Sequence, residues 1–273
     1  MQPDASKSAS PLASPEAWDL VADAYTTELL PIFERFSRDA LKLAALPTSA
    51  RVLDAAAGPG TLALLAAACG ARVSAIDFSP AMIAQLRRRA AAAGLSGIDA
   101  RLGDGQVLPF EDTSFDAAFS MFGLMFFPDR AAGFRELRRV LRPQGRAVAS
   151  SWAPFEGMFA LVMESIRAML PSLPFGHGAA PLCDPKRFAQ EMVEADLRDV
   201  VIHPVAYAET VQSVSEFWAS LQRTMAPVVL LRRKLGEQRW TTVARGVLDR
   251  LRSEAGDGPV DVRSTAYVGV GVK

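Results

Sequence analysis

The chain has 273 residues, of which 50% are hydrophobic and 22% are charged, a composition that suits one large globular domain with a buried core. Its 30 Lys and Arg residues balance 30 Asp and Glu residues, which excludes the strong positive charge typical of proteins that bind nucleic acid or anionic membranes. No secretory signal is visible, and the longest apolar run is too short to span a bilayer. The two cysteines, Cys69 and Cys183, form neither a disulfide framework nor a metal-ligand spacing. We therefore predict a cytoplasmic protein without a metal ion, with Cys69 packed in the core.

The N-terminal part of the chain divides into a polar tail and a helical segment. Residues 1–14 are small and polar with no hydrophobic period, so we expect a disordered tail. Residues 15–50 follow a helical period, and Pro31 is expected to divide them into two helices. Trp18 and Tyr25 lie on one face of the first helix, where they either pack against the domain or cover a ligand as a lid.

Residues 51–60, RVLDAAAGPG, predict a strand followed by a tight turn. The apolar run that ends in Asp54 is typical of a buried parallel strand, and residues 61–69 continue as a helix. The turn between them is made of small residues and includes Gly58 and Gly60. Such a loop brings bare backbone and helix-terminal N–H groups close to a nucleotide-like ligand.

Two further acids follow the next two predicted strands. Residues 72–77 form a strand that ends in Asp77, 23 residues after Asp54, which is close to the spacing at which an acid binds the hydroxyls of a ribose. Residues 98–102 form a third strand, which leads into Asp104. We interpret Asp104 as an acceptor for an adenine amino group, which predicts one nucleoside and not a dinucleotide. The alternative is an ordinary turn aspartate.

The remaining segments continue an alternating pattern. In the first half, we expect helices over residues 80–93 and 130–141 and strands over residues 115–120 and 146–152. Five strands alternating with helices predict an α/β fold with a doubly wound, mostly parallel sheet. Beyond residue 152, we expect helices over 155–170 and 185–195, a strand over 198–207, mainly helical structure over 211–258 and a strand over 262–272.

Four stretches in this order carry a family resemblance: VLDAAAGPG, VSAIDFSPAMI, GDGQVLPFEDTSFDAAFS and ELRRVLRPQGRAV. Residues 51–152 resemble class I S-adenosylmethionine-dependent methyltransferases. The most similar subgroup includes the ubiquinone/menaquinone C-methyltransferases and small-molecule methyltransferases of bacterial secondary metabolism. The resemblance implies a Rossmann-like sheet of seven strands, the last of them antiparallel. Residues 153–273 then supply the remaining strands, with helical insertions over 153–187 and 208–258 around the acceptor pocket.

The resemblance also implies S-adenosyl-L-methionine as the cofactor. It places the glycine turn against the methionine part, Asp77 at the ribose and Asp104 at the adenine. The implied cofactor-binding residues are Asp54, Ala56, Gly58, Gly60, Asp77, Phe78, Asp104, Gly105, Gln106, Ser120 and Met121. Ala56 departs from the family pattern, which has glycine at that position, and this small-for-small change costs little space.

Methyl transfer from a sulfonium is an in-line displacement, so the protein mainly positions the acceptor and excludes water. A phenol or carboxylic acid needs little more, whereas a less acidic hydroxyl or a carbon acceptor gains from a base. His177 and Tyr25 are the catalytic candidates, and the alternatives are an exposed loop residue and a packing residue. Aromatic residues after the fourth and fifth strands predict a substrate pocket: Phe122, Phe126, Trp152 and Phe155.

The predicted function is transfer of a methyl group to a small, partly apolar or aromatic metabolite, with oxygen as the acceptor atom. C-methylation of a quinone-like ring and N-methylation of an amine are alternatives. Two other classes stay open: a nicotinamide-dependent oxidoreductase that uses Gly58-x-Gly60-x-x-Ala63, and a non-catalytic protein that keeps the cofactor pocket. The chain is expected to act as a monomer or homodimer, without nucleic-acid or membrane partners.

Overall fold

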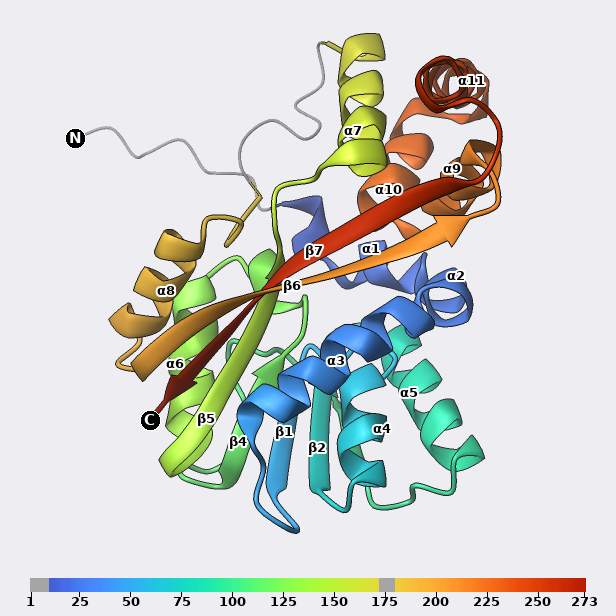
Figure 1. Cartoon of the computed structure of the whole chain (residues 1–273). Coiled ribbons are helices and arrows are strands. Elements are labelled where there is room, and N and C mark those ends of the chain that lie inside the picture. Colours follow the sequence, from blue (N-terminus) through green and yellow to red (C-terminus); the bar gives the residue numbers. More distant parts are fainter. Residues whose placement is uncertain (1–9, 172–179) are drawn as a thin grey trace, which may run out of the picture.

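The computed structural model describes residues 10–171 and 180–273. Within these residues, one seven-stranded sheet has the order β3-β2-β1-β4-β5-β7-β6 (Figure 1). β1 to β5 pair in parallel, and β7 lies antiparallel between β5 and β6. The strands are β1 (Arg51–Ala55), β2 (Arg72–Asp77), β3 (Asp99–Leu102), β4 (Phe115–Ser120), β5 (Leu141–Trp152), β6 (Arg198–Val211) and β7 (Val260–Val272). The predicted mostly parallel, seven-stranded fold is confirmed.

Helices cover both faces of the sheet. Successive strand residues point to opposite faces, so the apolar residues of one strand pack against helices on both sides. The α-helices are α1 (Pro15–Asp19), α2 (Ala22–Glu28), α3 (Leu30–Ala44), α4 (Thr61–Ala68), α5 (Pro80–Ala92), α6 (Arg130–Val140), α7 (Gly157–Met169), α8 (Pro185–Glu194), α9 (Val214–Thr224), α10 (Ala226–Leu235) and α11 (Glu237–Ala255). Val52 belongs to a core cluster with side chains of α3 and α4, and Leu53 belongs to one with side chains of α6 and α8. The central strands are therefore buried on both faces, as is usual for parallel sheets.

The N-terminal segment differs from the prediction at two points. The expected disorder is wrong for residues 10–14, because a 3-10 helix at Pro11–Ala13 is held by the Trp18 indole N–H, which donates to the Leu12 carbonyl at 2.9 Å. α3 begins next to Pro31, as predicted, but a second break at Leu20 separates α1 from α2. Residues 1–9 of the predicted tail lie outside the described residues.

The C-terminal helices separate into two groups. α8 packs on the sheet beside α6, whereas α7, α9, α10 and α11 form a helical layer with its own core around Trp218 and Trp240. β6 and β7 extend past their predicted ends to Val211 and Val260, and their extensions carry the helical layer beyond one end of the sheet (Figure 1). β5 already begins at Leu141, directly after α6, because a proline two residues later cannot continue a helix.

Three further predictions concern the burial of Cys69, membrane-spanning helices and metal ligands. Cys69 is exposed and its predicted burial is wrong, because α4 ends one residue earlier, at its solvent-facing end. In the described part of the chain, no helix is long and apolar enough to cross a membrane. Nor do these residues bring together three His, Cys, Asp or Glu side chains as metal ligands.

Candidate cofactor site

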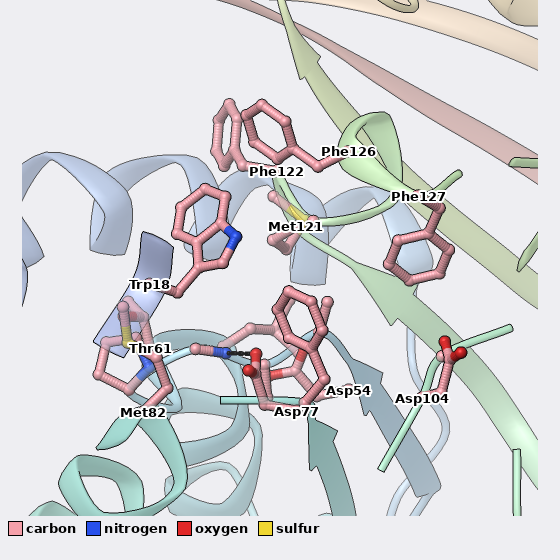
Figure 2. A pocket seen from close by; sticks show the side chains of 18 of the residues that line it. Trp18, Asp54, Thr61, Asp77, Met82, Asp104, Met121, Phe122, Phe126 and Phe127 are labelled. Atoms are coloured by element: carbon pink, nitrogen blue, oxygen red, sulfur yellow. Dashed lines mark hydrogen bonds between the residues drawn. The ribbon is translucent and has the colours of Figure 1, made fainter. Parts of the chain in front are cut away.

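A cavity of about 270 Å³ lies at the carboxyl ends of β1, β2 and β4. The loops after β1 to β4 line one side of it, and α1, α2 and α3 close the opposite side. In Figure 2, aromatic rings face carboxylates across the cavity: Trp18, Phe122 and Phe126 on one side, Asp54 and Asp77 on the other. This edge of the sheet is where ligands bind in open α/β folds.

The turn after β1 is held in a left-handed backbone conformation. Ala56, Gly58 and Gly60 have φ angles of 57°, 54° and 77°. The Gly58 N–H donates to Asp77 Oδ2 at 2.8 Å, which ties the turn to the end of β2. A Cβ atom on Gly60 would lie 2.5 Å from Leu86 Cγ, whereas a Cβ atom on Gly58 would meet nothing within 4 Å. The turn therefore presents bare backbone to the cavity at Gly58.

Ala56 occupies a position where the backbone favours glycine. Its methyl group fits because residue 123 is glycine: a Cβ atom on Gly123 would collide with Ala56 Cβ. Steric crowding is thus not the main energetic cost of alanine at position 56. The left-handed conformation costs an L-residue about 1–2 kcal/mol, and Ala56 adopts it at a φ of 57°. The similar size of alanine and glycine, on which the prediction rested, does not reveal this conformational cost.

Replacing Ala56 by glycine is expected to raise the free energy of unfolding by about 0.5–1 kcal/mol. Relief of the left-handed strain outweighs the freedom that glycine adds to the unfolded chain. Urea denaturation of the ligand-free protein measures the change. Ala57→Gly is the matched control and should lower stability, because Ala57 has no positive φ to relieve. A loss of stability in both variants would contradict the strain at Ala56.

Asp54 and Asp77 are buried acids at the floor of the cavity, with 1% and 5% of their surface exposed. Asp54 Oδ2 accepts from the Ala63 N–H at 3.1 Å, and Asp77 Oδ1 accepts from the Ser79 N–H at 2.9 Å. Burial raises the pKa of Asp54 to about 7, and the charge of Asp77 adds to this rise. Burial also raises the pKa of Asp77 to about 6, although the N–H groups of Ser79 and Gly58 oppose the rise. Both groups therefore titrate near neutral pH in the ligand-free protein.

Asp104 lies at the far side of the cavity, after β3. Its Oδ1 accepts from the Gln106 N–H at 2.8 Å and from Gln106 Nε2 at 3.0 Å. Gln106 Oε1 in turn accepts from the Asp129 N–H at 2.8 Å, which joins this loop to the start of α6. A Cβ atom on Gly105 would lie 2.5 Å from the Phe127 ring, so glycine allows the ring to line the cavity. Asp104 thus shapes its own turn and also faces the cavity.

Phe122 holds a strained position at the end of β4. Its φ is 58°, which is rare for a bulky residue. The Phe122 N–H donates to Ser150 Oγ at 2.9 Å, and its ring stacks on Trp152 with the centroids 4.2 Å apart. The ring of Phe33 on α3 packs edge-on against it at 5.1 Å. These contacts fix the Phe122 side chain at the cavity wall, where stored strain is typical of functional sites.

The helices α1 and α2 form a lid over the cavity. The Trp18 ring lies 5.0 Å from the Phe126 ring, between centroids, and closes the cavity from the side of α1. Asp19 Oδ1 accepts from Ser79 Oγ at 2.6 Å and from the Ala81 N–H at 3.1 Å, which fastens the lid to the start of α5. The alternatives for Trp18 are therefore not exclusive, because it packs and covers the cavity at once.

Tyr25 lines the cavity from α2 and stacks on Phe33 at a centroid distance of 5.0 Å. Burial, together with the nearby charge of Asp77, raises the pKa of the Tyr25 hydroxyl above its ordinary value. The hydroxyl therefore keeps its proton at neutral pH and donates hydrogen bonds. This arrangement permits Tyr25 to act as a positioning hydroxyl and does not suit a general base.

The helical layer supports the lid from behind and does not line the cavity within the described residues. Ala226 of α10 shares an apolar cluster with Ala17 and Val21. Arg223 of α9 forms an ion pair with Glu28 of α2 at 2.7 Å. The described residues of these insertions thus lie on the outer side of the lid, and their role around an acceptor pocket stays a prediction.

Several predicted site residues do not line this cavity. Gly60 is the N-cap residue of α4, and Ser120 Oγ accepts from the Leu124 N–H at 3.1 Å inside the core. Trp152 supports Phe122 from behind, and Phe155 points outward, 38% exposed, onto the Phe159 ring. His177 lies outside the described residues. Other residues line the cavity without a signal in the sequence, among them Ser37, Thr61 and Met82.

Comparisons with known proteins bear on this site. A family model described as a methyltransferase domain matches residues 52–145, the strands and turns that build the cavity floor. These residues form a class I S-adenosylmethionine-dependent methyltransferase domain. The predicted family is confirmed for this part of the chain. The methyltransferase domain thus contains Asp54, Asp77 and Asp104, whereas the lid and the helical layer lie outside the matched residues.

Two relatives and one solved structure extend the comparison. An uncharacterised protein of Mycobacterium tuberculosis is 40% identical over 126 residues, which cover 46% of this chain and 45% of the relative. The demethylmenaquinone methyltransferase of Beutenbergia cavernae is 37% identical over 153 residues, 54% of this chain and 60% of the relative. The chain thus spans about half the length of the curated relatives it matches. The YcgJ protein of Bacillus subtilis, 20% identical, has the same fold with a TM-score of 0.59 over 87% of this chain and 97% of its own.

Proposed function

We propose that this chain transfers a methyl group from S-adenosylmethionine to a small, apolar or aromatic acceptor. The charge of the cavity carries the proposal. Its described lining includes Asp54, Asp77 and Asp104 but no Arg, Lys or His side chain. Such a lining attracts cations and repels phosphates. S-Adenosylmethionine carries a positive sulfonium, whereas a nicotinamide dinucleotide carries a negative pyrophosphate, so the same lining argues against the oxidoreductase alternative.

The described residues suit each part of this cofactor. Asp77 offers carboxylate oxygens to the ribose hydroxyls, Asp104 offers an acceptor to the adenine amino group, and Gly58 offers bare backbone to the amino-acid part. The cavity volume of about 270 Å³ lies just below the usual range for ligand pockets, about 300–1,000 Å³. When bound, the cofactor supplies an activated methyl group.

The chain itself contributes position and the exclusion of water. Met121, Phe122 and Phe126 give the wall after β4 an apolar surface that suits a neutral, planar acceptor. The described lining offers no histidine, and Tyr25 keeps its own proton. An acceptor that is itself acidic, such as a phenol, needs no base from the protein. We therefore propose O-methylation of a phenolic or enolic oxygen.

The alternatives differ in their support. Similarity to the demethylmenaquinone methyltransferase of B. cavernae favours a quinone-like ring as the second candidate, methylated at carbon. An amine is less suitable, because the acidic lining would hold it as an unreactive ammonium. A secondary metabolic role, a cytoplasmic location and a monomeric or dimeric state stay predictions.

Transfer of a labelled methyl group tests the proposed reaction. The purified protein is incubated with methyl-labelled S-adenosylmethionine and a panel of phenols, quinols and amines, and the products are identified by mass spectrometry. We expect label on a phenolic oxygen. Label only on ring carbon would select the C-methylation alternative. Cofactor binding without transfer to any panel member would instead favour a non-catalytic protein.

The lid bonds of Asp19 give a kinetic prediction. Replacing Asp19 by alanine removes two hydrogen bonds between α1 and α5, so the dissociation rate of S-adenosylhomocysteine should rise by about tenfold. Stopped-flow displacement measures this rate. Asp249→Ala, an exposed change on α11, is the control and should leave the rate unaltered. An unchanged rate in the Asp19 variant would show that these bonds do not hold the lid closed.

A further inference from the structure

The turn after β4 rests on two buried serines. Ser120 Oγ accepts from the Leu124 N–H at 3.1 Å, and Ser150 Oγ accepts from the Phe122 N–H at 2.9 Å. Both serines are 0% exposed. No backbone carbonyl of the described residues accepts from the Phe122 N–H, since the pairing of β4 with β5 ends at Ser120. The Ser150 hydroxyl therefore supplies the acceptor that the backbone of Phe122 would otherwise lack.

Ser150 and Trp152 hold Phe122 from one face of β5. Residues two apart on a strand point to the same face of the sheet, so Ser150 binds the backbone of Phe122 while Trp152 contacts its ring. The two rings stack with their centroids 4.2 Å apart, and Phe36 of α3 packs edge-on against the Phe122 ring at 5.5 Å. One strand therefore holds both the backbone and the side chain of Phe122.

The ring held in this way forms part of the cavity wall. Phe122 lines the cavity, whereas Trp152 behind it does not. A left-handed φ of 58° is unfavourable for a bulky side chain, so Phe122 keeps this conformation only because its contacts impose it. The position of the Phe122 ring thus depends on Ser150, and it sets how far the cavity extends toward β5.

We propose that Ser150 is a positioning residue that sets the size selectivity for the acceptor through Phe122. This inference rests on the proposed function, in which the apolar wall after β4 receives a phenol. With Ser150 in place, the Phe122 ring closes the cavity in front of Trp152 and favours an acceptor with one ring. Without the Ser150 hydroxyl, Phe122 returns to a negative φ and its ring leaves the wall. The cavity then extends to Trp152 and admits two fused rings.

Two phenols of different size test this inference on the full chain saturated with S-adenosylhomocysteine. Isothermal titration gives the ratio of the Kd of 1-naphthol to the Kd of phenol. We expect Ser150→Ala to lower this ratio by about fivefold, the effect of one lost buried hydrogen bond, with the Kd of S-adenosylhomocysteine nearly unchanged. Phe122→Leu, which shortens the wall directly, should lower the ratio as well.

Ser120→Ala is the matched control for Ser150→Ala. It also removes a buried serine hydroxyl that accepts from the backbone of the same turn, but its partner Leu124 does not line the cavity. This variant should therefore keep the wild-type ratio. Circular dichroism and the thermal midpoint of each variant establish that it is folded.

The outcomes separate this inference from the proposed function. A wild-type ratio in folded Ser150→Ala, or in Phe122→Leu, would overturn the inference. An equal fall of the ratio in Ser120→Ala would also overturn it, because general loosening of the turn would then explain the effect. The same holds if the wild-type chain, once loaded with S-adenosylhomocysteine, binds neither phenol. Failure of the wild-type chain to bind S-adenosylhomocysteine would instead refute the proposed cofactor.

Discussion

Replacing Asp77 by alanine is expected to weaken binding of S-adenosylmethionine by about thirty- to a hundredfold, the effect of losing charge-assisted hydrogen bonds worth about 2–3 kcal/mol. Among the described residues, Asp77 is the one acid that both faces the cavity and fixes the glycine turn, through the Gly58 N–H at 2.8 Å. Its removal thus deletes the ribose acceptor and loosens the backbone that approaches the cofactor. Isothermal titration calorimetry measures the change in Kd.

The loss of affinity should not reflect unfolding. Burial raises the pKa of Asp77, so the ionised carboxylate lowers the free energy of unfolding of the ligand-free protein. The ligand-free Asp77→Ala variant should therefore keep a thermal midpoint close to that of the wild type. Asp77→Asn is the graded control, because its amide oxygen still accepts from the Gly58 N–H, and it should bind with intermediate affinity. A change in Kd of less than twofold in Asp77→Ala would contradict the ribose role.

Raising the pH from 5 to 8 is expected to strengthen binding of S-adenosylmethionine by about tenfold or more. In the ligand-free protein, burial raises the pKa of Asp54 to about 7 and that of Asp77 to about 6. Both carboxyls are therefore mainly protonated at pH 5 and ionised at pH 8. The ionised forms attract the sulfonium and ammonium and accept hydrogen bonds from the ribose. Titrations at several pH values give the profile.

The free energy of unfolding of the ligand-free protein should instead fall as the pH rises. The pKa values of both acids in the folded chain lie above the ordinary value of 3.8, so the folded chain holds more protons than the unfolded chain between these values. The stability from these groups is therefore lost as the pH rises through about 6 to 7. The thermal shift caused by the cofactor should grow over the same range, and Asp77→Asn should remove the step near pH 6. A thermal shift independent of pH would contradict this electrostatic coupling.

The core of the fold was predictable because its signals are local. Asp54 and Asp77 each end a short apolar run, and helices follow both runs, so the positions of the strands and their parallel order follow from the sequence. The acids then meet at one edge because the carboxyl ends of parallel strands lie together. The acids at the floor of the site could therefore be predicted from the sequence alone.

The rest of the site depends on contacts between distant segments. Nothing near Asp19 in the sequence indicates its bonds to Ser79 and Ala81, and these bonds decide that α1 covers the cavity. Trp152 does not line the cavity because the Phe122 ring lies in front of it, and Phe155 packs on the Phe159 ring instead. Likewise, α9 and α10 follow the extended strands to the outer side of the lid, which helical periodicity alone does not reveal.

The central claim is that the acidic cavity binds the cationic methyl donor, and calorimetric titration of the ligand-free chain tests it most directly. Separate titrations with S-adenosylmethionine, S-adenosylhomocysteine and NADH at pH 8 compare the three ligands under one condition. We expect saturable one-to-one binding of the first two and none of NADH, because the acidic lining repels the NADH pyrophosphate. Binding of NADH, or the absence of binding by both adenosyl ligands, would contradict it.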